Sequence, residues 1–171
     1  MPLSALADHY CCAESIDDLA RAAIEFSVGR AERLLLMRVQ AGRASVWHER
    51  GLGLTDETRR LLSFQVNSEP LLQLLSGEHH YFGPVPPRED VLFSYRKLGV
   101  DPPVELLLIP IRVNDLLVAI ALADGGCQGR VRGALEDLLT AFHGFGMSVG
   151  LLAMRRKIRA AMGADAQTAV A

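Results

Sequence analysis

The feature that most constrains the fold is a pair of long apolar runs near the middle of the chain. Residues 104–113 and 116–123 read VELLLIPIRV and LLVAIALA, with Asn114 and Asp115 between them. Apolar runs of this length, joined by a two-residue Asn-Asp turn, predict an antiparallel β-hairpin. Pro110 interrupts the first run and has no N–H to donate to a neighbouring strand. We therefore expect it either on an edge strand or at a β-bulge.

A second hairpin precedes the first in the chain. Residues 33–40 (RLLLMRVQ) and 43–51 (RASVWHERG) flank a tight turn at Ala41 and Gly42. The continuous apolar run at 34–37 is typical of a strand that is covered on both faces. Between the two hairpins the sequence predicts short strands and helices. These are a helix after Thr55, strands at 63–66 and 79–83, a helix capped by Ser68 and closed by Gly77, and a helix at 88–98.

Helices are expected at both ends of the chain. Apolar residues recur at helical spacing over 15–28, where Ser15 is a suitable N-cap. A long helix is predicted over 131–160, and its basic residues near the end suit a helix C-terminus. These are Arg155, Arg156, Lys157 and Arg159. This order of elements predicts an α+β three-layer sandwich, with a mainly antiparallel central sheet, the terminal helices on one face and the short helices on the other.

Size and composition fit one folded domain. The chain has 171 residues, of which 50% are hydrophobic and 22% charged, which is globular composition. We expect an N-terminal tail at 1–13, a domain at 14–160 and a disordered C-terminal tail at 161–171.

Charge and hydropathy limit the expected partners and location. A formal net charge of −2 gives no electrostatic reason to expect binding to nucleic acid or to an anionic membrane. Residues 138–154 are the most membrane-like, but about 17 residues is the short limit for a span and His143 lies inside, so we expect no membrane insertion. The N-terminus lacks a signal-peptide pattern. Three cysteines without metal-type spacing, Cys11, Cys12 and Cys127, suit a reducing cytoplasm.

Three stretches resemble GAF domains, small sensory domains related to PAS domains. The segment 33–53 (RLLLMRVQAGRASVWHERGLG) is similar to the first hairpin of that family, and 64–86 (FQVNSEPLLQLLSGEHHYFGPVP) to its middle. The segment 106–126 (LLLIPIRVNDLLVAIALADGG) is similar to its closing hairpin. The resemblance covers roughly residues 15–155 and implies the GAF-like sandwich of a bacterial stand-alone signalling domain.

The resemblance also implies where a ligand would bind, because GAF domains hold small molecules between the sheet and the middle segment. The aromatic residues expected to approach such a pocket are Trp47, Phe64, Tyr81, Phe93 and Tyr95. The alternative is that these side chains fill the core. The sequence lacks the cyclic-nucleotide motif of the family, and Cys127 does not match the position that binds bilin, so the cofactor is left unknown.

The last helix is expected to form an interface. Six residues with 3-4 spacing form an a/d seam: Leu135, Leu138, Phe142, Phe145, Val149 and Leu152. A second apolar face contains Leu139, Gly146, Met147, Gly150, Leu151 and Met154. One face would cover the sheet and the other would meet a partner. GAF domains commonly dimerise through their first and last helices, so we expect a homodimer through the seam. One wide buried stripe within a monomer is the alternative.

No catalytic signature is present in the sequence. It has no Ser-His-Asp pattern, P-loop or dinucleotide fingerprint, and the spacing of His48, Glu49, His79 and His80 is not that of a metal site. The leading hypothesis is a non-catalytic signalling domain that senses a small ligand and binds protein partners. One alternative is a scaffold whose pocket is filled by Leu and Phe. The other is a methionine sulfoxide reductase that uses the cysteines.

Overall fold

The computed structural model describes residues 1–75, 79–127, 129–131 and 135–168, with 162–168 described by their backbone alone. In chain order the elements are α1 (Leu3–Cys12), α2 (Ile16–Phe26), β1 (Arg33–Gln40), β2 (Arg43–Arg50), α3 (Asp56–Leu61), β3 (Ser63–Gln65), the 3-10 helix η1 (Leu72–Leu75), β4 (Tyr81–Pro84), α4 (Glu89–Lys97), β5 (Glu105–Val113), β6 (Leu116–Asp124) and α5 (Leu135–Thr168).

The six strands form one antiparallel sheet in the order β3-β2-β1-β6-β5-β4. Both predicted hairpins are confirmed. In the β5–β6 turn, Asn114 and Asp115 have φ values of 49° and 64°. In the β1–β2 turn, Ala41 and Gly42 have φ values of 49° and 75°. Two successive left-handed residues match the twist of the flanking strands, which is why these short turns close the hairpins.

Pro110 lies where β5 is locally an edge strand and beside a bulge. Strand β4 pairs with β5 only between Glu105 and Leu108, so β5 has no strand partner on that side at Pro110. The pairing of β5 with β6 then shifts register between Ile111 and Arg112. Both expected settings for the proline are therefore present, and its missing N–H removes no hydrogen bond to β4.

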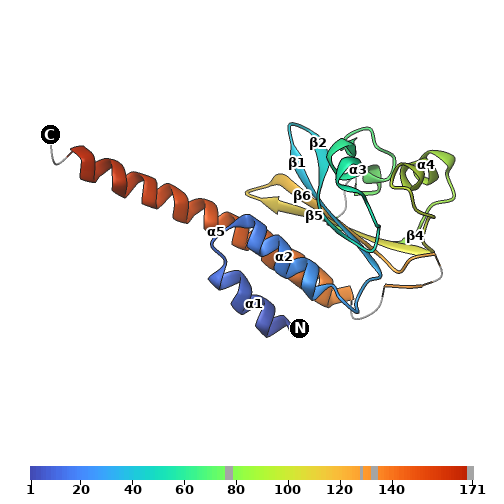
Figure 1. The fold of residues 1–171 in the computed structure, drawn as a ribbon, viewed down its shortest axis with the longest axis horizontal. Helices are drawn as coiled ribbons and strands as arrows, with labels where there is room; N and C mark the ends of the chain where they lie inside the picture. The colour runs from blue at the N-terminus through green and yellow to red at the C-terminus, as the bar shows by residue number, and fades with distance from the viewer. Residues whose placement is uncertain (76–78, 128, 132–134, 169–171) are drawn as a thin grey trace.

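Helices cover both faces of the sheet, as predicted. Helices α1, α2 and α5 lie together on one face, and α3, η1 and α4 lie on the other (Figure 1). Alternate residues of β1 point to opposite layers. Leu34 and Leu36 join the core under the terminal helices, while Leu35 and Met37 join the core under the short helices. The molecule is thus the α+β three-layer sandwich that the sequence predicted.

Three local expectations were wrong. Residues 3–12, expected to be a tail, form α1, because Leu6 and Tyr10 are buried against the terminal-helix core and the Tyr10 hydroxyl donates to the Ala141 carbonyl at 3.1 Å. The helix expected after Ser68 is the short 3-10 helix η1, and Gly77 lies outside the described residues. Helix α5 does not end at residue 160 but continues to Thr168, projecting beyond the sheet (Figure 1).

Helix α5 is long and apolar enough over Leu135–Ala161 to cross a membrane, judged by length and composition alone. Its side chains Leu138, Phe142 and Phe145 are nevertheless buried against the sheet. Burial of this kind is typical of the core helix of a folded domain.

Candidate functional site

The face of the sheet under the middle segment, where the sequence placed a ligand, is largely filled by side chains. Phe64 and Tyr95 are both buried there, in a core shared with Leu71 and Leu98. The cavity bordered by Phe64, Leu71 and Leu98 is too small to admit a water molecule. A hollow of about 410 Å³ lies farther along this face, between η1 and the β5–β6 hairpin, and none of the five predicted aromatic residues lines it.

The five aromatic residues do not converge on one pocket. Tyr81 lies with Phe64 and Tyr95 on the middle-segment face, half-buried, and its hydroxyl donates to the Pro84 carbonyl at 2.6 Å. Phe93 lies on the outer side of α4, 52% exposed. Trp47 lies across the sheet, against the terminal-helix core. Three of the five therefore share a layer, and two of those three are buried.

A buried carboxylate ties the middle segment to α4. Glu69 is buried, and it accepts a hydrogen bond from the Ser94 hydroxyl and one from the Lys97 ammonium group at 2.9 Å. These two contacts neutralise and solvate a charge that would otherwise be costly to bury. Glu69 could not be predicted as a buried residue, because nothing in the surrounding sequence separates a buried glutamate from an exposed one.

A second buried pair joins the central strands at their ends. Arg33 Nε and Asp124 Oδ1 are 2.6 Å apart, and Asp124 is completely buried. Burial raises the pKa of the Asp124 carboxyl, while the hydrogen bond from Arg33 opposes that rise. The Tyr95 hydroxyl is buried and makes no hydrogen bond to the described residues. Its pKa is raised, mainly by burial and further by the charge of Asp124.

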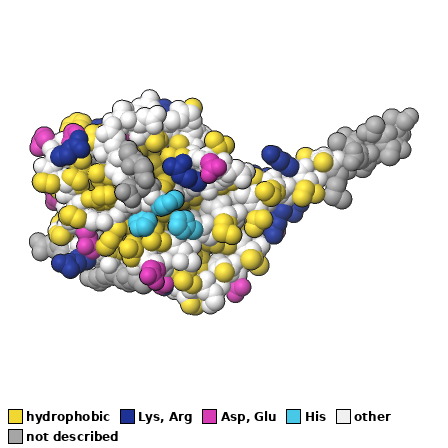
Figure 2. Space-filling view, turned by 180° about the vertical axis from the view of Figure 1, so that it is seen from behind, with side chains coloured by type: hydrophobic (Ala, Val, Ile, Leu, Met, Phe, Trp, Pro, Cys, Tyr) yellow, Lys and Arg dark blue, Asp and Glu magenta, His cyan; other side chains and the backbone are white. Residues whose placement is uncertain are grey.

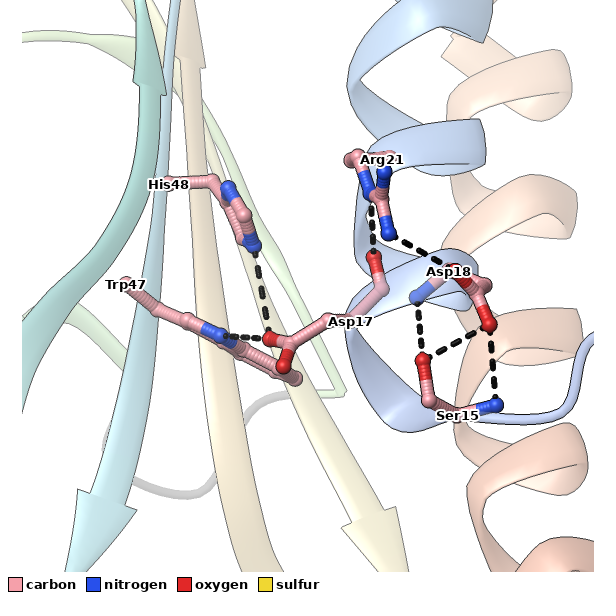
Figure 3. Close-up of polar contacts among 6 residues, drawn as sticks. All are labelled: Ser15, Asp17, Asp18, Arg21, Trp47 and His48. Atoms are coloured by element: carbon pink, nitrogen blue, oxygen red, sulfur yellow. Dashed lines mark hydrogen bonds and ion pairs between the residues drawn. The ribbon is translucent and has the colours of Figure 1, made fainter.

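A polar cluster links α2 to β2 on the opposite face (Figure 3). The Asp17 carboxylate accepts a hydrogen bond from Trp47 Nε1 at 2.7 Å and lies 3.7 Å from His48 Nε2. Leu36 pairs with His48 and Met37 pairs with Val46, so Trp47 is the extra residue of a β-bulge. This bulge allows two consecutive residues of β2 to reach the same carboxylate. Burial lowers the pKa of His48, and Asp17 opposes this shift.

The same figure shows how α2 is fixed at its start. Ser15 and Asp18 form a reciprocal capping box, in which the Ser15 hydroxyl accepts from the Asp18 N–H and the Asp18 carboxylate accepts from the Ser15 N–H. Arg21 forms an ion pair with Asp18 at 2.8 Å. The predicted cap at Ser15 is confirmed, and it positions Asp17 against the bulge of β2.

The two apolar faces of α5 have the reverse of their expected roles. Within the predicted seam, Leu138, Phe142, Phe145 and Leu152 are buried and Leu135 and Val149 are partly buried against the same core. The seam therefore covers the sheet. The open residues belong in part to the second face: Met147, Leu151 and Met154 are exposed by 71%, 53% and 54%, and Ile158, one turn farther along the helix, by 59%.

A groove of about 480 Å³ borders this open face, between α5 and the end of the β5–β6 hairpin. His79 and His143 line it together with Met147, Leu151 and Arg112. Figure 2 shows histidine side chains lying among hydrophobic ones on this side of the molecule. The groove is apolar with a basic rim, so it suits an apolar side chain better than a reaction that needs a positioned acid and base.

The glycines of α5 serve the contact with the sheet. A Cβ at Gly146 would lie 3.1 Å from Ile111 Cγ2 and 3.2 Å from the Arg112 carbonyl oxygen, and one at Gly150 would lie 3.3 Å from Val113 Cγ1. These residues let α5 approach β5 closely.

The structure provides no metal or thiol cluster in the part of the chain that it describes. Among the described residues, no group of three or more His, Cys, Asp or Glu side chains could hold a metal ion. Cys11, Cys12 and Cys127 are exposed and unbridged.

No family model and no curated protein matches this sequence. Solved structures match its fold. A GAF domain from a phosphoenolpyruvate-protein phosphotransferase of Coxiella burnetii aligns with a TM-score of 0.67 at 14% identity, over 93% of this chain and 94% of that one. A GAF domain of a two-component sensor histidine kinase from Bacillus halodurans gives 0.61 at 15% identity, over 84% and 99%. A phycocyanobilin-bound GAF domain from a cyanobacterial phytochrome gives 0.63 at 13%, over 91% and 97%. At these identities the likeness establishes a shared fold.

Proposed function

We propose that this chain, which has the GAF fold, is a non-catalytic signalling domain that acts as a cytoplasmic homodimer and passes a signal to protein partners. The solved structures above come from a histidine kinase, a phosphotransferase and a phytochrome, which supports a role in signalling. The observation that carries the proposal is the open apolar stripe on α5, defined as Met147, Leu151, Met154 and Ile158.

The spacing of the stripe fits pairing with a second α5. Its residues are separated by four, three and four positions, which is the d-a-d-a pattern of a coiled coil. Because the stripe lies on the side of α5 opposite the buried seam, a second helix can pack there without disturbing the domain core. A stripe of large exposed apolar side chains on one helix face is typical of an interaction surface.

The charges beside the stripe are compatible with a parallel pair. In the same heptad frame Arg155 occupies an e position and Lys157 a g position. An antiparallel pair that buries the whole stripe would place Arg155 against Ser148 and Lys157 against Gly150, so the charges do not oppose that orientation either. In a parallel pair Arg155 faces Gly150 of the partner subunit, and Lys157 faces position 162, a methionine in the sequence. A parallel pair also carries both C-terminal segments of α5 in the same direction, which suits transmission to a partner.

Dimerisation can be tested with the double variant Leu151→Glu and Met154→Glu. We expect the wild type to have the mass of a dimer in light scattering after size exclusion, and the variant to have the mass of a folded monomer. Both side chains are exposed in the single chain, so the circular dichroism spectrum should be retained. Leu61→Glu is the matched control, because Leu61 is 75% exposed on α3, away from the stripe, and its variant should remain dimeric. A wild-type monomer, or a double variant that stays dimeric, would refute the proposed interface.

A second candidate function is a scaffold that binds proteins without sensing a ligand. The packed core around Phe64 and Tyr95 favours it, because the expected aromatic pocket holds no water-sized space. Small-molecule sensing on this face would have to use the hollow of about 410 Å³ between η1 and the β5–β6 hairpin. Native mass spectrometry of protein purified directly from its source cells distinguishes the two, because a sensor should carry a non-covalent small-molecule adduct and a scaffold should not.

A further inference from the structure

A hollow of about 380 Å³ lies between the α1–α2 connection and α5, away from the middle-segment face. Three arginines of α5 line it, Arg155, Arg156 and Arg159. Figure 1 shows the α1–α2 connection running beside α5 at the point where that helix leaves the body of the domain. The hollow therefore lies between the N-terminal helices and the helix that projects outward.

The basic cluster is not explained by the end of a helix. Because α5 continues to Thr168, the last turn contains no basic residue, and the favourable interaction with the helix dipole decays within one turn. Arg155, Arg156 and Arg159 also form no ion pair or hydrogen bond with the described side chains. The expectation that these residues serve the C-terminus of α5 is therefore wrong.

Nearby acids leave the hollow with an excess of positive charge. Glu14 is the acid among the residues that line it, so three guanidinium groups and one carboxylate give a formal charge of 3 − 1 = +2. The two acids at the start of α2 are already engaged. Asp17 binds Trp47 and lies near His48, and Asp18 accepts from Ser15 and pairs with Arg21 (Figure 3).

We propose that this hollow binds a small phosphorylated ligand, held by Arg155, Arg156 and Arg159. One guanidinium group can donate two parallel hydrogen bonds to two oxygens of a phosphate. A concave site with several guanidinium groups therefore favours a compact anion that carries two or more negative charges. A volume of about 380 Å³ is in the lower part of the range for small-molecule sites, which suits a phosphate monoester or diphosphate rather than a polymer. The bound ligand would lie between the α1–α2 connection and α5. Binding does not depend on dimerisation.

The chain contains its own reporter for this site. Arg156 also lines an adjacent hollow of about 240 Å³, together with Trp47, Arg38 and Asp17. Trp47 is the single tryptophan of the chain. A ligand that reorients Arg156 should therefore change the fluorescence of Trp47. Inorganic pyrophosphate is the probe, titrated at constant ionic strength by fluorescence and by calorimetry, and we expect saturable binding with one site per chain.

The variants Arg156→Gln and Arg159→Gln should each weaken pyrophosphate binding by about tenfold or more, because each removes a charge-assisted contact. Lys157→Gln is the matched control. It removes one positive charge from the same turn of α5, but Lys157 does not line the hollow, so its effect should stay within about twofold. All three side chains are exposed, so the thermal unfolding midpoint should be unchanged.

Alkylation offers an independent measurement. Cys12 lines the hollow and the adjacent Cys11 does not, although both are exposed. Pyrophosphate should slow the reaction of iodoacetamide with Cys12 and leave Cys11 unaffected, as followed by tandem mass spectrometry.

Three outcomes would overturn the proposal. The first is the absence of saturable pyrophosphate binding. The second is an equal loss of affinity in Lys157→Gln and Arg156→Gln, which would indicate diffuse attraction by the net charge. The third comes from vesicles of phosphatidylserine and phosphatidylcholine. If the protein sediments with these vesicles but does not bind soluble pyrophosphate, the arginines recognise a lipid headgroup at a membrane surface instead.

Discussion

At the scale of single residues, the two buried tyrosines differ in whether their hydroxyl groups are satisfied. Tyr10 donates to the Ala141 carbonyl, whereas the Tyr95 hydroxyl makes no hydrogen bond to the described residues. A buried polar group without a partner loses its hydration and gains nothing in return. Removing each hydroxyl in turn therefore compares the loss of a hydrogen-bonded group with the loss of an unpaired one.

We expect Tyr95→Phe to leave the free energy of unfolding unchanged or to raise it by up to about 1 kcal/mol, because it removes an unpaired hydroxyl. Tyr10→Phe should lower it by about 1 kcal/mol, because it removes a hydrogen bond between α1 and α5. Urea unfolding followed by circular dichroism measures both. If Tyr95→Phe were clearly the more destabilising of the two, an additional partner for its hydroxyl would have to exist.

At the scale of elements, α5 combines a core helix and an exposed interaction helix in one segment. Its N-terminal part buries Leu138, Phe142 and Phe145, and its later part exposes Leu151 and Ile158. The two glycines at 144 and 146 test how tightly the first part is packed. A Cβ at Gly144 would meet the Tyr10 ring at an ordinary 3.4 Å, whereas one at Gly146 would lie 3.2 Å from the Arg112 carbonyl.

Gly144→Ala should raise the free energy of unfolding by up to about 1 kcal/mol, because alanine is the better helix former and has room. Gly146→Ala has the same helical gain but must displace Ile111 or the backbone of Arg112, and overpacking costs about 1–3 kcal/mol. In thermal or urea unfolding we therefore expect Gly144→Ala to be the most stable, the wild type to be intermediate and Gly146→Ala to be the least stable. Equal stability of the two variants would show that β5 can shift away from α5 at no cost in free energy.

At the scale of the whole molecule, the two faces of the sheet have different properties. The middle-segment face holds the buried charges Glu69 and Asp124 in a packed core, and the terminal-helix face borders the open stripe and the arginine hollow. Helix α5 contacts the sheet, lines that hollow and extends beyond the body, so one element connects these three places. His48 lies in the contact between α2 and β2, with its Nε2 atom 3.7 Å from the Asp17 carboxylate.

Because the pKa of His48 is lowered in the folded state, the unfolded chain takes up its proton first as the pH falls. The stability that neutral His48 contributes is therefore present above pH of about 6.5 and is lost as the pH drops below it. Burial is the main cause of the lowered pKa of His48. The charges of Arg21 and Arg59 lower this pKa further, whereas Asp17 raises it. We expect His48→Gln to flatten the dependence of the unfolding free energy on pH below a pH of about 6.5. An unchanged slope in His48→Gln would assign the dependence to other groups.

The sequence alone determined the strands, their turns and the sandwich architecture, because these depend on local patterns. The Asn114-Asp115 turn, the continuous apolar run in β1 and the cap at Ser15 each specify a backbone conformation within a few residues. Tertiary structure decided what the side chains do. Only packing shows which apolar face of α5 covers the sheet, since both faces have helical periodicity. Likewise, only packing shows that Trp47 lies on one face of the sheet while Phe64 and Tyr95 lie on the other. The bulge in β2 changes the direction of its side chains, and no aromatic residue carries a sequence signal for one face or the other. The arginine hollow forms between segments far apart in the chain, and no local pattern records such a distance.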